Sequence, residues 1–395
     1  MTAYNFLEPY TFKNGLEVKN RIVMAPMTTM SSFHNGMITS DEFTYYEARS
    51  GGAGMIITAV AYISSGGKGF EGELSVHDDS MIPGLEKLAR TIQKNGTKAI
   101  LQIFHVGRKT STSVLRGTSP VSASPIPAAY PVDSEVPKEL TSGEIEQIID
   151  DFGEATRRAI QAGFDGVELH GANTYLLQQF FSEHSNRRSD KWGGSREKRL
   201  NFPLAVIEKS KDIIKKYAEK PFILGYRLSP EEVETPGIRL EDSLYFVDAI
   251  KEQVDYIHIS MGSYKRTSLN DPESTTPLLP QFVERTKGVV PLIGLGSVEV
   301  PKEAEEVLEL GADFVGIGRE LIREPKWVQK VESGDEENIR TQLSPSDMDE
   351  LQIPSVMQEY LIESFGKVMN FTTDPNEKED YSNQVAPMEG FEKKL

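Results

Sequence analysis

The sequence predicts a (β/α)₈ barrel, also called a TIM barrel, with an N-terminal β-hairpin and a C-terminal acidic extension. Short apolar runs recur eight times along the chain. They are continuous rather than strictly alternating, which is typical of parallel strands buried on both faces. Amphipathic segments separate them. The first run lacks a following glycine-rich dinucleotide fingerprint, which disfavours a doubly wound sheet, the structural alternative.

The predicted elements begin with a hairpin, because Asn14-Gly15 lies between two short β-like runs before the first strand. We expect this hairpin to close the bottom of the barrel. The eight predicted strands follow in order. They are Arg21–Pro26, Gly54–Ile63, Lys98–His105, Phe164–Gly171, Pro221–Ser229, Asp255–Ser263, Val290–Ser297 and Asp313–Glu320.

The segments between these runs carry helix signals. Thr141 followed by Glu144 has the spacing of a capping box, and the apolar residues after it repeat at helical spacing up to Gly163. Glycine suits the position just past a helix end. Gly96 and Gly311 end two further helical segments in the same way. Strands and helices therefore alternate, as a barrel requires.

Composition limits the classes of function. The chain has 395 residues, 38% of them hydrophobic, with a formal net charge of -17 and no cysteine. Such a charge disfavours nucleic acid and anionic membranes as partners. Without cysteine there are no disulfides, thiol nucleophiles or iron–sulfur clusters. The first residues show no signal-peptide pattern, so we expect a cytoplasmic protein that acts on a small molecule, with homo-oligomer formation left open.

The composition of the chain changes after residue 330, where acidic residues predominate. Residues 331–395 contain 15 acidic and 5 basic residues. We therefore expect a barrel domain over residues 1–330 and a C-terminal extension over residues 331–395. Ile353–Met369 inside the extension has a helical pattern. Thr372–Leu395 is predicted to be a polar, disordered tail.

Polar residues at the strand ends are the candidates for chemistry, since catalytic groups of such barrels lie at the carboxyl ends of strands. His170 and Asn173 follow the fourth strand, and both can donate a hydrogen bond to one oxygen. Tyr175 adds a phenolic proton nearby. The main alternative is that His170 has no catalytic role and only hydrogen-bonds to the backbone. A metal site is disfavoured, because the neighbouring strand ends offer no ligand set.

Other strand ends suggest a phosphorylated, aromatic ligand. Gln102 could hydrogen-bond the edge of a heterocycle, and Arg227 needs an anionic partner at the barrel mouth. The last two strands end in glycines, with Arg319 after Gly318, and these loops commonly bind phosphate. Tight turns alone would also explain the glycines. These residues leave open which phosphate is bound.

Longer motifs together resemble the Old Yellow Enzyme family of FMN-dependent ene-reductases. The resemblance extends from about residue 6 to residue 327. Its motifs are RIVMAPMTTM (21–30), LQIFHVGRK (101–109), GVELHGANTYLLQQFFSEHSNRRSDKWGGSREKR (166–199), GYRLS (225–229), the glycines of LIGLGS (292–297) and ADFVGIGRELIREPKW (312–327). Thr28 stands where many bacterial members have a cysteine.

The resemblance implies roles for individual residues. Pro26, Met27, Thr28 and Val60 would lie along the flavin, with Thr28 near its O4/N5 edge. Gln102 would bind the pyrimidine edge and Arg227 the N1/O2 region. The FMN phosphate would be held by Gly294, Gly296, Gly318 and Arg319. His170 and Asn173 would bind the substrate oxygen, and Tyr175 would donate a proton.

The resemblance therefore implies an NAD(P)H-dependent flavin oxidoreductase without a metal. NADH or NADPH would reduce FMN, and hydride from flavin N5 would then reduce an electron-poor alkene, such as an α,β-unsaturated carbonyl compound, a nitro compound or a quinone. Two alternatives remain. One is a phosphate-substrate barrel, either a lyase or an isomerase. The other is a non-catalytic flavin-binding protein.

Overall fold

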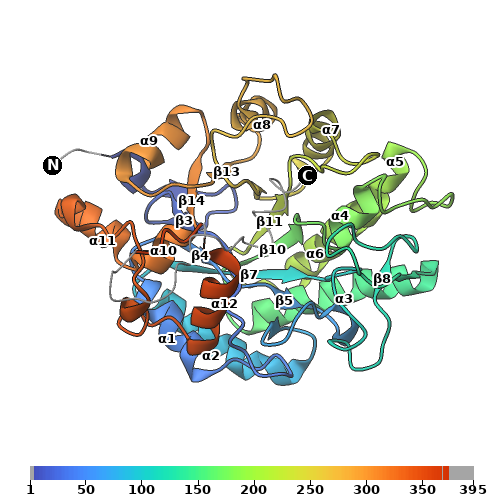
Figure 1. The fold of residues 1–395 in the computed structure, drawn as a ribbon, viewed down its shortest axis with the longest axis horizontal. Helices are drawn as coiled ribbons and strands as arrows, with labels where there is room; N and C mark the ends of the chain where they lie inside the picture. The colour runs from blue at the N-terminus through green and yellow to red at the C-terminus, as the bar shows by residue number, and fades with distance from the viewer. Residues whose placement is uncertain (1–3, 367, 373–395) are drawn as a thin grey trace.

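Parallel strands close into a barrel at the centre of the molecule, and helices surround it (Figure 1). The computed structural model describes residues 4–366 and 368–372. Pairing of β10 with β7 and of β14 with β3 closes the ring. The barrel strands are β3 (Ile22–Met24), β4 (Met55–Ile57), β7 (Lys98–Phe104), β10 (Gly166–Gly171), β11 (Ile223–Leu228), β12 (Tyr256–Ile259), β13 (Leu292–Leu295) and β14 (Phe314–Ile317). Each lies within one predicted run, so the predicted barrel is confirmed.

Helices follow the strands and cover the outside of the barrel. In chain order they are α1 (Ser40–Arg49), α2 (Ile82–Gln93), α3 (Ser142–Gln161), α4 (Leu176–Phe181), α5 (Arg196–Arg199), α6 (Asn201–Tyr217), α7 (Leu240–Ile250), α8 (Leu278–Thr286), α9 (Pro301–Glu309), α10 (Arg319–Arg323), α11 (Trp327–Ser333) and α12 (Ser355–Phe365). The capping box of α3 forms as predicted between Thr141 and Glu144. Gly163, just past its end, has a φ of 81°.

The predicted N-terminal hairpin is present as β1 (Tyr10–Thr11) and β2 (Glu17–Val18), which pair antiparallel. Its apolar side chains join the cluster formed by the inward-facing residues at the lower end of the barrel. Phe12, for example, stacks on Phe314 of β14 with ring centroids 5.5 Å apart. The hairpin therefore closes the bottom of the barrel.

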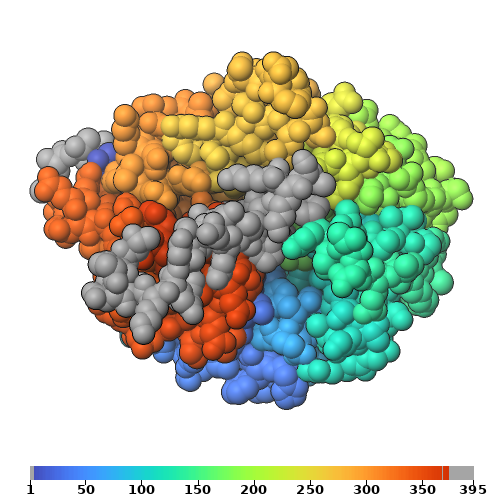
Figure 2. Space-filling view, in the orientation of Figure 1, coloured from blue at the N-terminus to red at the C-terminus, as the bar shows by residue number. Residues whose placement is uncertain are grey.

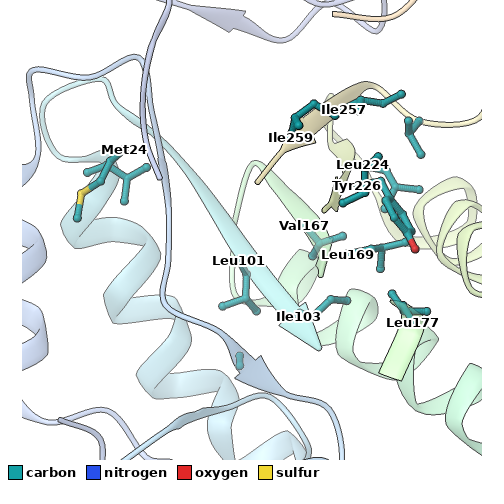
Figure 3. Packing of buried hydrophobic residues seen from close by; sticks show 14 of the residues in the cluster. Met24, Leu101, Ile103, Val167, Leu169, Leu177, Leu224, Tyr226, Ile257 and Ile259 are labelled. Carbon is teal, nitrogen blue, oxygen red and sulfur yellow. The ribbon is translucent and has the colours of Figure 1, made fainter. Parts of the chain in front are cut away.

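Side chains of the barrel strands alternate between two apolar clusters. In β7, Ile100 belongs to the inner cluster, whereas Leu101 and Ile103 belong to the outer cluster beneath the helices. Figure 3 shows part of the outer cluster, including Leu177 of α4. Full burial of one such side chain contributes about 1.5–3 kcal/mol. Because the period is two, Gln102 faces the interior as Ile100 does.

The predicted run from Gly54 to Ile63 is divided in the structure. Barrel strand β4 ends at Ile57, and the chain resumes as β5 (Ala61–Tyr62), which pairs with β7 and with β6 (Leu74–Ser75). Between them, the Ala59 N–H donates to the Tyr46 hydroxyl at 2.7 Å instead of to a neighbouring strand. A further short pair, β8 (Val121–Ser122) with β9 (Lys138–Glu139), lies outside the barrel.

The described part of the extension returns to the barrel. Helix α12, drawn in red, lies on the face turned toward the viewer in Figures 1 and 2, and it buries Met357 and Leu361. The predicted tail after Thr372 lies outside the described residues, and the division at residue 330 stays a prediction. No helix within the described ranges is long and apolar enough to cross a membrane.

Candidate active site

A cavity lies at the carboxyl ends of the barrel strands, where the sequence predicted a site. Almost all of the predicted site residues line it. They are Pro26, Met27, Thr28, Val60, Gln102, His170, Asn173, Tyr175, Arg227, Gly296, Gly318 and Arg319. These residues come from seven of the barrel strands and the loops that follow them. Parallel strands bring their carboxyl ends to one rim, which explains how residues so distant in sequence meet.

Gly294 is the exception: it does not line the cavity, and its predicted part in holding the phosphate stays a prediction. It lies within β13, and a Cβ atom added there would be 2.9 Å from Val307 and 3.0 Å from Leu279. Its open side therefore faces α8 and α9 rather than the cavity. Side chains alternate along a strand, so this glycine permits close packing of helices on the sheet. Gly296, beyond the strand end, does reach the cavity.

His170 and Asn173 place two donors side by side. Nε2 of His170 lies 3.4 Å from Nδ2 of Asn173, a separation at which both can donate to one oxygen. The Ala172 N–H donates to Nδ1 of His170 at 3.4 Å, which favours the ring proton on Nε2. Burial lowers the pKa of His170 well below its ordinary value, and the positive charge of Arg227 lowers it further. The imidazole is therefore a neutral donor.

The backbone holds Asn173 in an unusual conformation. Asn173 and Thr174 have φ values of 57° and 61°, a left-handed region that costs non-glycine residues about 1–3 kcal/mol. The Asn173 N–H donates to the Ser229 hydroxyl at 2.9 Å. The Ser260 hydroxyl donates to the side-chain oxygen Oδ1 of Asn173 at 3.2 Å, which leaves the side-chain nitrogen Nδ2 for the cavity.

Tyr175 stands beside this pair at the N-terminus of α4. Its ring makes edge contacts with His170 at 4.9 Å and with Phe104 at 4.8 Å between centroids. Burial raises the pKa of Tyr175, and Glu73 and Tyr360 raise it further. The phenol therefore keeps its proton at neutral pH and can act as an acid but not readily as a base.

Gln102 and Arg227 belong to a buried polar network inside the barrel. Nε2 of Gln102 donates to Oε1 of Glu168 at 2.6 Å, and Nδ1 of His258 donates to Oε2 of Glu168 at 2.8 Å. Arg227 donates from Nη2 to the Ser260 hydroxyl at 3.0 Å. Sequence reasoning missed Glu168 and His258. The signal that could have found them is the period of two: Glu168 lies two residues before the cavity residue His170 on β10, and His258 lies two residues before the cavity residue Ser260, just past the end of β12.

The last two strand ends form the other end of the cavity. Nη2 of Arg319 donates to the Ser297 hydroxyl at 2.8 Å. Gly296 has a φ of 124°, and a Cβ atom there would lie 2.6 Å from the Ser263 nitrogen, so no other residue fits. This end of the cavity therefore combines an arginine with a close backbone turn, as phosphate binding requires.

No sequence pattern indicated that the C-terminal extension would line the cavity. Residues of α12 and the segment after it do so: they are Met357, Tyr360, Leu361, Phe365 and Met369. Burial raises the pKa of the Tyr360 phenol to about 12. A helical pattern identified the helix, but no local signal shows where an amphipathic helix packs.

The donor set fits FMN. Nε of Arg227 is buried and has no hydrogen-bond partner among the described residues, so an arginine at the predicted N1/O2 position has donor capacity to spare. Gln102, Arg227 and Arg319 distribute amide and cationic groups along one cavity. A metal is not indicated there: the described residues contain no group of three or more His, Cys, Asp or Glu side chains that could hold one.

Comparison with known proteins supports this interpretation. The model of the NADH:flavin oxidoreductase / NADH oxidase family matches residues 5–338. A probable NADH-dependent flavin oxidoreductase of Bacillus subtilis (strain 168) is 41% identical over 362 residues, which are 91% of this chain and 96% of the relative.

Two relatives are much longer than this chain. The NADH:acrylate oxidoreductase of Vibrio harveyi is 45% identical over 359 residues, 90% of this chain but 36% of the relative. The NADH:fumarate oxidoreductase of Klebsiella pneumoniae (strain 342) is 44% identical over 334 residues, 84% of this chain and 36% of the relative. The chain thus spans about a third of the length of these two.

Solved structures share the fold. Morphinone reductase in complex with tetrahydroNAD superposes with a TM-score of 0.71 and 26% identity, covering 84% of this chain and 91% of that one. The Old Yellow Enzyme homologue from Zymomonas mobilis gives a TM-score of 0.72 and 25% identity, over 84% of this chain and 93% of that one. The predicted resemblance is confirmed.

Proposed function

We propose that this chain, which belongs to the NADH:flavin oxidoreductase / NADH oxidase family, uses NADH or NADPH to reduce electron-poor alkenes. The family relationship makes it an NAD(P)H-dependent flavin oxidoreductase of the Old Yellow Enzyme type with FMN as its cofactor. When bound, FMN accepts a hydride from the nicotinamide and delivers one to the substrate. The substrates that we propose are α,β-unsaturated carbonyl compounds, with nitro compounds and quinones as further candidates.

The observation that carries this proposal is the pair of donors on His170 and Asn173, 3.4 Å apart. Hydride addition to the β-carbon of a conjugated carbonyl places negative charge on the carbonyl oxygen. Two fixed N–H donors in a buried site stabilise that charge as it develops. Binding FMN alone requires neither residue, so the pair favours catalysis over a flavin carrier.

Tyr175 is the proposed proton donor to the α-carbon. Its raised pKa keeps the phenol protonated, and its ring touches His170. A phenol whose pKa is raised is a weak acid, which suits protonation of a strongly basic carbanion-like carbon rather than of a neutral group. The donor pair and Tyr175 therefore act on different atoms of one substrate.

The remaining cavity residues are proposed to hold FMN. Pro26, Met27, Thr28 and Val60 would contact the ring system, with the Thr28 hydroxyl near the O4/N5 edge. Gln102 and Arg227 would bind the pyrimidine side, and Gly296, Gly318 and Arg319 the phosphate. All of these residues line the same cavity.

The names of two relatives suggest which alkenes to test. They describe oxidoreductases of acrylate and fumarate, which are conjugated carboxylates. Because this chain matches about a third of each, the alkene site of those proteins could lie in the remainder. A second candidate function is therefore an NADH-oxidising flavin protein that passes electrons to a separate acceptor.

One kinetic experiment separates these functions. The purified protein is loaded with FMN, reduced anaerobically with NADH or NADPH, and mixed with 2-cyclohexenone, acrylate, fumarate or a benzoquinone. Rapid reoxidation by an alkene supports the proposal. Reoxidation by the quinone alone favours the electron-passing function. A flavin that no nicotinamide reduces indicates a carrier, and failure to bind FMN favours the phosphate-substrate lyase or isomerase.

A further inference from the structure

The barrel interior beneath the cavity contains a carboxylate with no role in the proposed chemistry. Glu168 is fully buried in the middle of β10, with 0% of its surface exposed. It lies opposite Gln102 of β7 in the strand register, and the next inward residue, His170, lies opposite Arg227 of β11. An isolated buried charge is costly, so a carboxylate at this place requires partners.

Glu168 has those partners, and one of them, Gln102, is proposed to hold the pyrimidine side of FMN. Both carboxylate oxygens accept a hydrogen bond, from Gln102 at 2.6 Å and from His258 at 2.8 Å. Burial by itself raises the pKa of Glu168, but His258, Arg227 and Gln102 outweigh it and lower the pKa. Burial lowers the pKa of His258 despite this contact. The pair is therefore an anionic carboxylate with a neutral imidazole.

The hydrogen bond from Gln102 fixes the orientation of its amide. Because one N–H of Nε2 is turned toward Glu168, the carbonyl oxygen of the amide is turned away from that carboxylate and is available to the cavity, which Gln102 lines. That oxygen can only accept a hydrogen bond. Glu168 thus determines that the cavity is offered an acceptor oxygen at this position.

The charge of Glu168 also opposes that of Arg227. Arg227 is buried and is attracted electrostatically to Glu168. In the cavity, the electric field of the Glu168 carboxylate partly cancels the field of the Arg227 guanidinium. Arg227 therefore stabilises negative charge in the cavity less strongly than it would without Glu168. FMN gains negative charge on reduction, at the pyrimidine side where Arg227 is proposed to lie.

We infer that Glu168 is a positioning residue that fixes the Gln102 amide and keeps the reduction potential of bound FMN low by offsetting Arg227. The inference rests on the proposed placement of Gln102 and Arg227 along the flavin. A lower potential makes the reduced cofactor a stronger hydride donor, which suits reduction of weakly activated alkenes. His258 supports the ionised form by donating to the second carboxylate oxygen.

The test compares Glu168→Gln, which keeps the shape and removes the charge, with Glu168→Asp, which keeps the charge. The potential of the FMN-loaded proteins is measured by equilibration with a reference dye. Glu168→Gln should raise the potential, with at least a tenfold shift in the ratio of reduced to oxidised flavin, or about 30 mV for a two-electron couple. Glu168→Asp should stay close to the unaltered protein. A potential unchanged in Glu168→Gln, or equal shifts in both variants, overturns the inference.

Glu232→Gln is the matched control. Glu232 is also a buried glutamate that accepts side-chain hydrogen bonds, from Gln178 at 2.7 Å and from Ser182, but it does not line the cavity. This substitution should leave the flavin potential unchanged. A potential shift in Glu232→Gln as large as that in Glu168→Gln would mean that replacing any buried, hydrogen-bonded glutamate suffices, and would refute a specific role for Glu168.

A second measurement uses the unaltered protein and therefore does not depend on whether a variant folds. Ionisation of the bound flavin at N3 is followed by absorbance as the pH is raised, against free FMN in the same buffer. An acceptor oxygen from Gln102 favours the protonated N3–H, so the protein should shift this ionisation to higher pH. A shift to lower pH would overturn the amide orientation. If FMN does not bind at all, the proposed function fails instead, which is a different outcome from an unshifted potential.

Discussion

Removing the Asn173 amide tests the proposed oxyanion donors most directly. The variant of choice is Asn173→Gly, because Asn173 has a φ of 57° and glycine adopts positive φ without steric cost. An alanine at this position would add backbone strain of about 1 kcal/mol or more to the loss of the amide. The glycine variant therefore isolates the missing hydrogen bond.

The expected magnitude follows from the geometry. Nδ2 of Asn173 and Nε2 of His170 lie 3.4 Å apart, so each can supply one of the two hydrogen bonds proposed to the same substrate oxygen. A hydrogen bond to a charged group contributes about 1.5–3 kcal/mol, or roughly 10- to 150-fold in rate. Fixed donors in water-excluded sites reach about 10²–10³-fold. We expect the alkene half-reaction to slow about 10²-fold.

Stopped-flow absorbance of the flavin measures this half-reaction after reduction with NADH or NADPH. Binding of a phenol, whose oxygen can occupy the same place, is titrated in parallel and should weaken in Asn173→Gly and in His170→Ala. Thr174→Gly is the control, because Thr174 has a similar φ of 61° but does not line the cavity. Unchanged phenol affinity in both donor variants would show that the pair does not bind the substrate oxygen.

Four further outcomes are expected. Tyr175→Phe should leave flavin reduction and phenol binding intact but slow the reaction with enones. The reaction with a nitroalkene should keep its rate, because the nitronate product needs no proton from the enzyme. Equal slowing with both substrates would contradict the proton-donor role. Arg319→Ala should weaken FMN retention, measured by flavin content after dialysis, by about 1.5–3 kcal/mol of binding free energy. Thr28→Ala should lower the flavin potential, which slows reduction by the nicotinamide and speeds reoxidation by enone in stopped-flow. Because the pKa of His170 is lowered and that of Tyr175 is raised, neither group changes protonation between about pH 6 and pH 9. The rate of the alkene half-reaction should therefore not depend on pH in that range. A change in rate near pH 6.5 that disappears in His170→Ala would contradict this.

The barrel could be predicted from the sequence because its strands are buried on both faces. Continuous apolar runs with glycine-terminated helices between them leave few arrangements, and each run contains one barrel strand. The predicted strand from residue 54 to residue 63 had the least accurate bounds. Its division between β4 and β5 depends on the Tyr46 hydroxyl, a partner supplied by α1 that no local pattern reveals.

Most of the cavity could also be predicted, because the fold class fixes where strand ends meet. Two glycines in LIGLGS suggest one phosphate loop, but Gly294 still lies inside the strand, faces the helices and does not line the cavity. The contribution of α12 could not be predicted. Its helical period shows an apolar face, whereas the surface that receives this face is assembled from residues far away in the sequence.

The buried network shows how one strand period builds both the core and the site. The inward-facing residues of β7 pass from Ile100 to Gln102, and those of β12 pass from Tyr256 to His258. Ile100 and Tyr256, at the lower end, belong to the apolar cluster that the hairpin closes. Gln102 and His258, two residues further along each strand, carry polar groups that hydrogen-bond Glu168. The polar groups are tolerated there because Glu168 connects them, and Gln102, which lines the cavity, is held in one orientation by this contact. The inner faces of these two strands thus pass from apolar core to polar network within two residues, directly beneath the cavity.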